Sequence, residues 1–223
     1  GISSGFEVPA RLMHAAGFAL YEAKAKGAGS ICCFDPEKYA KQKSDIENIR
    51  AFSELLDKNL FTYHFQPIVS SSTGEIVAYE ALMRTKGNIA LNPLQILNCA
   101  KNFGRLYDIE KATLKNTLKY LSKHQLDFEN RRLYINSISS HALDDKDFYA
   151  IVNDYGELLE KVVIEMTEQT EISEDDLDRI RVRLEKNNMS LAIDDYGTGY
   201  SNTSNLLRYD PEVVKIDRSL ISG

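Results

Sequence analysis

From about residue 60 onward the chain repeats one unit, in which an apolar run of strand length precedes a segment with helical spacing of apolar residues. Continuous apolar strands that alternate with helices are typical of a parallel sheet covered by helices, because such a sheet is buried on both faces. This α/β pattern predicts a TIM-like (β/α) barrel. The expected strands are 61–69, 75–83, 132–138, 162–166, 190–193 and 213–216.

The domain organisation follows from where this repeat begins. A closed (β/α)8 barrel takes about 250 residues, whereas residues 52–223 supply only six expected strands, so we expect the barrel to be incomplete at its C-terminus. Residues 36–51 lie in a charged helical stretch with an apolar stripe, and we interpret them as a connector helix that docks on the barrel. Residues 1–35 hold an expected helix, Pro9–Lys26, and an expected strand, Ser30–Phe34. One helix and one strand cannot close a core, so we interpret this part as the remnant of a larger domain.

The composition limits the possible partners and location. The chain has 27 Lys and Arg against 33 Asp and Glu, a formal net charge of −6. Binding to a DNA or RNA polymer depends on basic side chains, so an acidic chain argues against it, whereas a phosphate ligand remains compatible if metal ions lie between it and the carboxylates. Cys32, Cys33 and Cys99 form no C-x-x-C spacing and fit a reducing compartment. No run approaches the length of a membrane span and no signal peptide opens the chain. We expect a cytoplasmic protein, with any membrane anchor outside these residues.

Polar side chains recur at the C-terminal ends of five successive expected strands. A single carboxylate after a strand is usually a helix cap or a solvated loop residue. The set as a whole indicates a shared functional site, because all strand ends of a barrel open onto the face that carries the active site. The residues at these ends are Glu80, Asn136, Glu165, Asp194, Asp195, Lys215 and Asp217.

These residue types favour a divalent metal centre. Clustered carboxylates raise one another's pKa unless cations lie among them, and oxygen ligands without His or Cys favour Mg²⁺ or Mn²⁺. The adjacent Asp194 and Asp195 can serve two ions, or one ion and its bound water. A site with two ions suits hydrolysis at phosphate, and Lys215 can polarise the nucleophile or hold a phosphate oxygen. The pattern leaves a metal-dependent lyase or isomerase open, because enolase-type barrels also place acids on successive strands.

Six segments carry a family resemblance, in a fixed order and spacing over nearly all of residues 52–223. They are FQPIV at 65–69, YEALMR at 79–84, YINSIS at 134–139, IEMTE at 164–168, DDYGTGYSN at 194–202 and VKIDRS at 214–219. In these segments the sequence resembles the EAL family of cyclic-di-GMP phosphodiesterases. Residues 15–34, AAGFALYEAKAKGAGSICCF, resemble the C-terminal end of an α+β GGDEF domain, with Gly17 where that family usually has Asp.

The resemblance implies an activity and a set of roles. The activity is hydrolysis of cyclic-di-GMP to linear pGpG in bacterial second-messenger signalling, with two Mg²⁺ or Mn²⁺ ions and a homodimer formed through the barrel. The implied metal ligands are Glu80, Asn136, Glu165, Asp194 and Asp195, and the implied catalytic residues are Lys215, Glu80 and Asp195. The implied substrate-binding residues are Gln66, Leu82, Arg84 and Asp217. Glu168 would brace the loop at 196–201.

One departure from the family pattern bears on activity. The family has a further strand with E-G-V-E and a Q-G-Y segment that complete the site, and neither occurs here. We therefore expect a chain that ends at Gly223 to be inactive alone and its full-length parent to be an active cyclic-di-GMP phosphodiesterase. Two alternatives remain open, a non-catalytic module that senses cyclic-di-GMP and another divalent-metal barrel enzyme such as a lyase.

Overall fold

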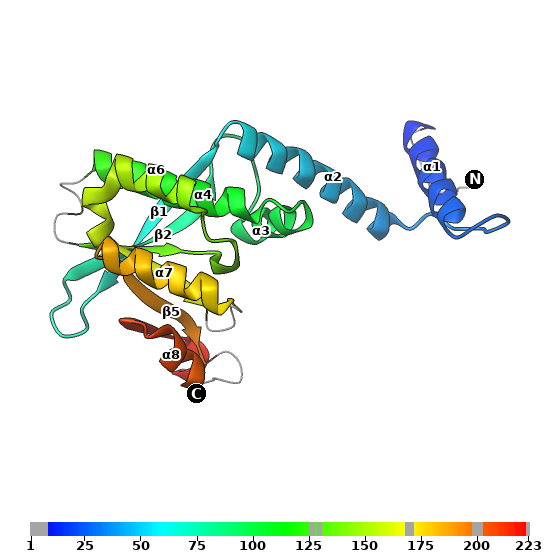
Figure 1. Cartoon of the computed structure of the whole chain (residues 1–223). Coiled ribbons are helices and arrows are strands. Elements are labelled where there is room, and N and C mark those ends of the chain that lie inside the picture. Colours follow the sequence, from blue (N-terminus) through cyan, green and yellow to red (C-terminus); the bar gives the residue numbers. More distant parts are fainter. Residues whose placement is uncertain (1–8, 125–127, 129–130, 168–171, 198–202, 222–223) are drawn as a thin grey trace. The chain divides into compact units, whose positions relative to one another are not determined.

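The computed structural model describes residues 9–124, 128, 131–167, 172–197 and 203–221 (Figure 1). The chain divides into two compact units, Gly1–Ser53 and Glu54–Gly223. Helix α2, Pro36–Asp57, runs across the division between them.

The first unit is built around three aromatic rings. Phe18 lies on helix α1, Pro9–Ala25, and its ring centroid is 6.1 Å from that of Phe34 and 5.4 Å from that of Tyr39. The predicted helix is confirmed, but the predicted strand at 30–34 is wrong, because residues 30–35 have no regular structure. A strand needs a partner for its backbone hydrogen bonds, and the described part of this unit offers none.

The second unit contains a six-stranded sheet in the order β1-β2-β3-β4-β5-β6. The strands are β1 Phe61–Val69, β2 Ile76–Thr85, β3 Arg132–Asn136, β4 Val162–Thr167, β5 Ser190–Tyr196 and β6 Val213–Ile216. Neighbours from β2 to β6 are parallel, as predicted, whereas β1 and β2 are antiparallel. The reason is the short turn at Gly74, since a parallel pair needs a crossover of a dozen or more residues.

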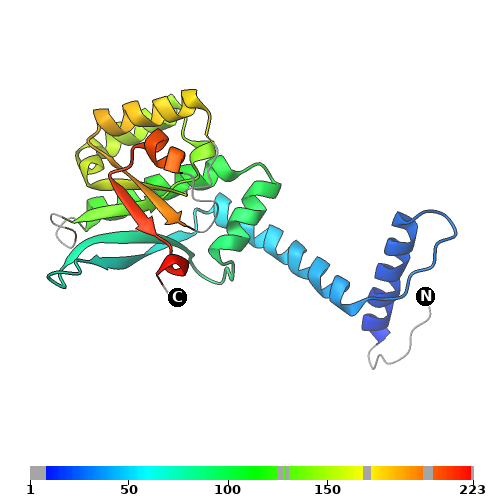
Figure 2. The same ribbon diagram turned by 90° about the horizontal axis from the view of Figure 1, so that it is seen from below.

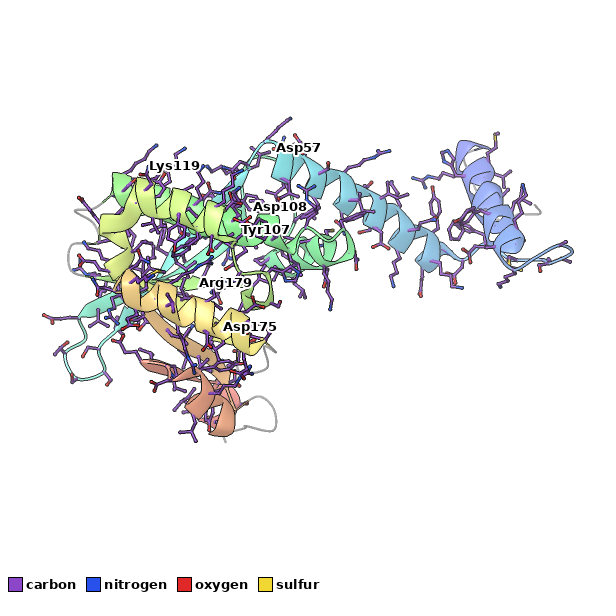
Figure 3. All side chains as sticks on the ribbon, viewed as in Figure 1. Asp57, Tyr107, Asp108, Lys119, Asp175 and Arg179 are labelled. Atoms are coloured by element: carbon purple, nitrogen blue, oxygen red, sulfur yellow. The ribbon has the colours of Figure 1, made fainter. Side chains whose placement is uncertain are left out.

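Helices cover one face of this sheet (Figures 1 and 2). They are α3 Pro93–Asn102, α4 Leu106–Lys123, α6 Asp145–Tyr155, α7 Glu174–Lys186 and α8 Thr203–Tyr209, with 3-10 turns η1 Ser139–His141, η2 Gly156–Lys161 and η3 Arg218–Leu220. Ser173 caps α7 by accepting a hydrogen bond from the Asp176 N–H, which confirms the predicted cap. Leu177 of α7 belongs to one buried apolar cluster with Met166 of β4 and Leu191 of β5. Tyr107 of α4, which is labelled in Figure 3, donates a 2.8 Å hydrogen bond to Asp147 of α6.

The opposite face of the sheet carries a second apolar layer, and this layer positions the polar site. Ala78, Tyr134, Val163 and Ala192 form a buried cluster there, and Val213 packs against it. Side chains of a strand alternate between faces, so the residue two positions further on lies on the same face. The residues two positions beyond this layer are Glu80, Asn136, Glu165, Asp194 and Lys215.

Candidate metal centre

Three carboxylates from adjacent parts of the sheet meet on this face. Glu80 of β2, Glu165 of β4 and Asp194 of β5 each offer an oxygen, and these oxygens all lie within 4.8 Å of one another. Glu165 and Asp194 stand near the C-terminal ends of their parallel strands, whereas Glu80 lies in the middle of β2, near the end of the part that pairs with β3, Ala78–Ala81. The prediction that Glu80 ends its strand is therefore wrong, because β2 continues to Thr85 in its antiparallel pairing with β1. The sequence prediction that these strand ends share one site agrees with this geometry.

The ammonium group of Lys215, on β6, lies among the three carboxylates. Its Nζ is 2.6 Å from Glu165 Oε1, 3.1 Å from Asp194 Oδ2 and 3.2 Å from Glu80 Oε2. Burial lowers the pKa of Lys215, but contact with Glu165 and Asp194 outweighs burial and raises the pKa overall. Lys215 is therefore a cation, and when all three carboxylates are ionised the cluster still carries two uncompensated negative charges.

Glu165 is the most buried member of this group. Its side chain is 1% exposed, and burial raises its pKa to about 7. Its Oε1 contacts Lys215, but its buried Oε2 has no hydrogen-bond partner among the described residues. A buried polar atom without a partner costs roughly 1–3 kcal/mol. A divalent cation would satisfy this oxygen and the excess negative charge together, so the residues present fit a metal ion.

Asn136 and Asp195 lie beside the three carboxylates. The Asn136 Nδ2 donates a 3.1 Å hydrogen bond to Glu80 Oε1, which links β3 to β2. Asp195 is exposed, with φ of 57°, at an irregularity in the register between β5 and β6. Such a bulge redirects a side chain, and this explains how two consecutive carboxylates reach the same end of the sheet. Partial burial and the neighbouring Asp194 and Asp217 raise the pKa of Asp195.

The Asp217 carboxylate has a local partner. It caps the η3 turn by accepting a 2.8 Å hydrogen bond from the Ser219 N–H, and this bond lowers its pKa. Its own N–H donates to the Tyr196 carbonyl at 3.0 Å, so η3 is tied to the segment that follows the two aspartates.

The predicted substrate-binding residues on β1 and β2 share the face of the metal centre. Gln66 is exposed and pairs directly opposite Glu80 in the β1–β2 ladder. Leu82 and Arg84 follow Glu80 at two-residue intervals, and Arg84 Nη1 donates a 2.7 Å hydrogen bond to the Met83 carbonyl. Glu168, predicted to brace the loop, lies outside the described residues.

The structure adds Glu110, a residue on α4 that the sequence reasoning did not select. Its carboxylate accepts hydrogen bonds from the Ser137 hydroxyl and the Ile138 N–H, each at 2.7 Å. These two residues directly follow Asn136. The available signal was a charged residue on the buried stripe of α4, between Ile109 and Thr113.

The comparison with protein families gives this chain its class. The profile described as EAL domain matches residues 49–223, which is most of the chain, so the chain belongs to the EAL domain family. No described helix is both long enough and apolar enough to cross a membrane.

Curated relatives carry related names. Cyclic di-GMP phosphodiesterase NbdA of Pseudomonas aeruginosa is 27% identical over 223 residues, which cover 94% of this chain and 28% of that protein. Cyclic di-GMP phosphodiesterase PdeR of Escherichia coli is 25% identical over 210 residues, which cover 91% of this chain and 32% of that protein. The chain spans about a third of the length of these relatives.

Solved structures share the fold. A PaMucR phosphodiesterase in complex with c-di-GMP matches with a TM-score of 0.61 at 23% identity, covering 78% of this chain and 74% of the other. BlrP1 of Klebsiella pneumoniae, in a manganese and cy-diGMP complex, matches with a TM-score of 0.62 at 24% identity, covering 73% of this chain and 41% of the other. The predicted EAL-type α/β fold is thereby confirmed.

Proposed function

We propose that the full-length parent protein hydrolyses cyclic-di-GMP to linear pGpG at a centre of two Mg²⁺ or Mn²⁺ ions. The observation that carries this proposal is the group of three carboxylates around Lys215, with an unsatisfied buried oxygen on Glu165. Two relatives are named cyclic di-GMP phosphodiesterases, which makes this cyclic dinucleotide the substrate of choice. In the reaction a water oxygen bonds to one phosphorus, the bond from that phosphorus to a 3′ oxygen breaks, and the 3′ oxygen takes a proton.

The ligands of the ions are assigned by position. Glu80, Asn136, Glu165 and Asp194 would ligate metal, and Asp195 would serve the second ion. When bound, such ions lower the pKa of a water molecule and neutralise charge on the phosphate. The bulge at Asp195 supports its separate role, because its carboxylate lies outside the group formed by Glu80, Glu165 and Asp194.

Lys215 would orient the attacking water or a phosphate oxygen. Its raised pKa keeps it an ammonium group, so it acts as a donor and a positive charge. Asp195 and Glu80 complete the proposed catalytic set.

The substrate groove would be lined by Gln66, Leu82, Arg84 and Asp217. Arg84 suits a phosphate, because a guanidinium binds two of its oxygens at once. We also propose that Glu168 braces the loop after β5. The remaining proposals concern the whole protein, namely a GGDEF remnant at 1–35, a connector at 36–51, a homodimer through the barrel and a cytoplasmic location.

Incubation of the full-length parent protein with cyclic-di-GMP and Mn²⁺, followed by chromatography of the products, tests this proposal. We expect pGpG to form, EDTA to abolish its formation, and Glu165→Gln to reduce the rate by at least about 100-fold, in line with loss of a group that stabilises charge in the transition state. Binding of cyclic-di-GMP without turnover would favour a sensor instead. Failure to bind any cyclic dinucleotide would favour a different metal-dependent barrel enzyme.

A further inference from the structure

Helix α4 presents a carboxylate to the end of strand β3, on the side of the sheet that the helices cover. Glu110 is partly buried, on the same face of α4 as the buried Thr113 and Leu114. It lines a cavity of about 60 Å³ together with Leu114, Ser137 and Arg183. A carboxylate in such a position is costly unless its oxygens are well bonded.

Both carboxylate oxygens of Glu110 accept hydrogen bonds from one short segment, residues 137–138. Oε1 accepts from the Ser137 hydroxyl and Oε2 accepts from the Ile138 N–H, each at 2.7 Å. The Glu110 carboxylate forms no ion pair with any described residue. Arg183, which lines the same cavity, uses its two terminal nitrogens on Asp145 and on the Leu143 carbonyl, and its Nε has no partner among the described residues. The two hydrogen bonds to the segment are therefore the main interactions of this charge.

The segment that Glu110 holds is bonded to the metal centre in two further places. The Ser137 N–H donates a 2.9 Å hydrogen bond to the carbonyl of Glu165, so it is fixed to the strand that carries the buried metal ligand. The Asn136 side chain donates to Glu80 at 3.1 Å. Asn136 thus lies between Glu80 on one side and a turn that Glu110 and Glu165 immobilise on the other.

We propose that Glu110 is a positioning residue for the metal centre, which fixes the turn at Ser137 and Ile138 and thereby holds the Asn136 amide in place to ligate an ion. This inference rests on the proposed function, because that proposal makes Asn136 a ligand. Residues that orient metal ligands typically change metal affinity by about 10–100-fold when they are removed. The effect of Glu110 is therefore on metal affinity, beyond any effect on folding.

The test is the dissociation constant of Mn²⁺, measured by titration of the metal-free protein. We expect Glu110→Ala to weaken Mn²⁺ binding by about 10–100-fold. Glu110→Gln should rescue binding to within about 3-fold, because its amide accepts from the Ile138 N–H and donates to the Ser137 hydroxyl. Ser137→Ala, which removes one of the two bonds, should fall between them.

Lys111→Ala is the matched control. Lys111 is the next residue on α4 and pairs with Asp147 of α6 at 2.7 Å, without an ion pair or hydrogen bond to the turn among the described contacts. We expect this variant to leave Mn²⁺ affinity unchanged even if it lowers stability. Wild-type affinity in Glu110→Ala, or equal weakening in Lys111→Ala, would overturn the proposal.

Hydrogen exchange in the metal-free protein separates this inference from the proposed function. The Ile138 amide should lose protection in Glu110→Ala and keep it in Lys111→Ala, whatever metal or substrate the protein uses. Unchanged protection of Ile138 in Glu110→Ala would refute the positioning role. Lost protection together with no Mn²⁺ binding by the wild-type protein would instead refute the proposed function, and with it the role of Asn136.

Discussion

At the scale of residues, the site is defined by an excess of negative over positive charge. Lys215 contacts three carboxylates and balances only one of them, and Glu165 is 1% exposed with an unsatisfied oxygen. The sequence predicted these residues, because each was expected at the end of an apolar strand and strand ends of a barrel converge, although β2 in fact continues past Glu80 to Thr85. It could not predict Glu110, since a Glu in a helix becomes informative only when the helix is packed against the turn that it holds.

The pKa of Glu110 leads to a prediction about how the stability of the fold depends on pH. Burial raises its pKa above the usual value of 4.5. Folding therefore favours the protonated form, so the stabilisation from this group is complete below pH 4.5 and is lost as the pH rises through the folded-state pKa. In the metal-free protein, we expect the wild type to lose stability relative to Glu110→Gln as the pH rises from 4.5.

Urea unfolding at a series of pH values, with EDTA present, measures this difference. Glu160→Gln serves as the control, because Glu160 is exposed, and its difference from the wild type should stay nearly constant with pH. The prediction would be contradicted if the difference in unfolding free energy between the wild type and Glu110→Gln did not depend on pH. It would also be contradicted if the wild type gained stability relative to Glu110→Gln as the pH rises.

At the scale of elements, hydrophobic periodicity predicted where the strands lie, but it did not predict how all of them pair. The described strands β1 to β6 fall where apolar runs were expected, and β1 matches its predicted bounds at Phe61–Val69. The antiparallel start of the sheet follows from the length of the β1–β2 turn, which a count of apolar strands ignores. Residues 30–34 have the composition of a strand, but a strand forms only where a neighbour accepts its hydrogen bonds, and that is a property of the fold.

Gly197, directly after β5, is an element boundary that is sensitive to substitution. Its φ is 104°, a conformation that L side chains rarely adopt, and an added Cβ would collide with Leu220 of η3. We expect Gly197→Ala to lower the free energy of unfolding by about 1–2 kcal/mol. It should also weaken Mn²⁺ binding, because it displaces the segment that follows Asp194 and Asp195.

Gly104→Ala provides the control for backbone strain. Gly104 has a φ of 63° and no atom within 4 Å of an added Cβ, so this variant should lose stability and retain Mn²⁺ affinity. Adding Leu220→Ala to Gly197→Ala should recover little stability, because the backbone strain remains. Full recovery in that double variant would show that the collision, and not the backbone, sets the cost.

At the scale of the whole molecule, the sequence motifs identified the family, and the fold brings the candidate site residues together. The matched region, residues 49–223, begins close to the predicted start of the barrel at residue 52. The proposed metal centre draws on five strands, β2 to β6, that span residues 76–216. Its assembly therefore depends on long-range packing of the sheet, which local sequence patterns indicate only indirectly.

Diffraction from crystals soaked in Mn²⁺, recorded at the manganese absorption edge, tests the central claim most directly. We predict an anomalous peak about 2.0–2.6 Å from oxygens of Glu80, Glu165 and Asp194, with the Lys215 ammonium moved away from the ion. An absence of manganese between these side chains at saturating concentration, with the metal bound elsewhere or not at all, would contradict the account.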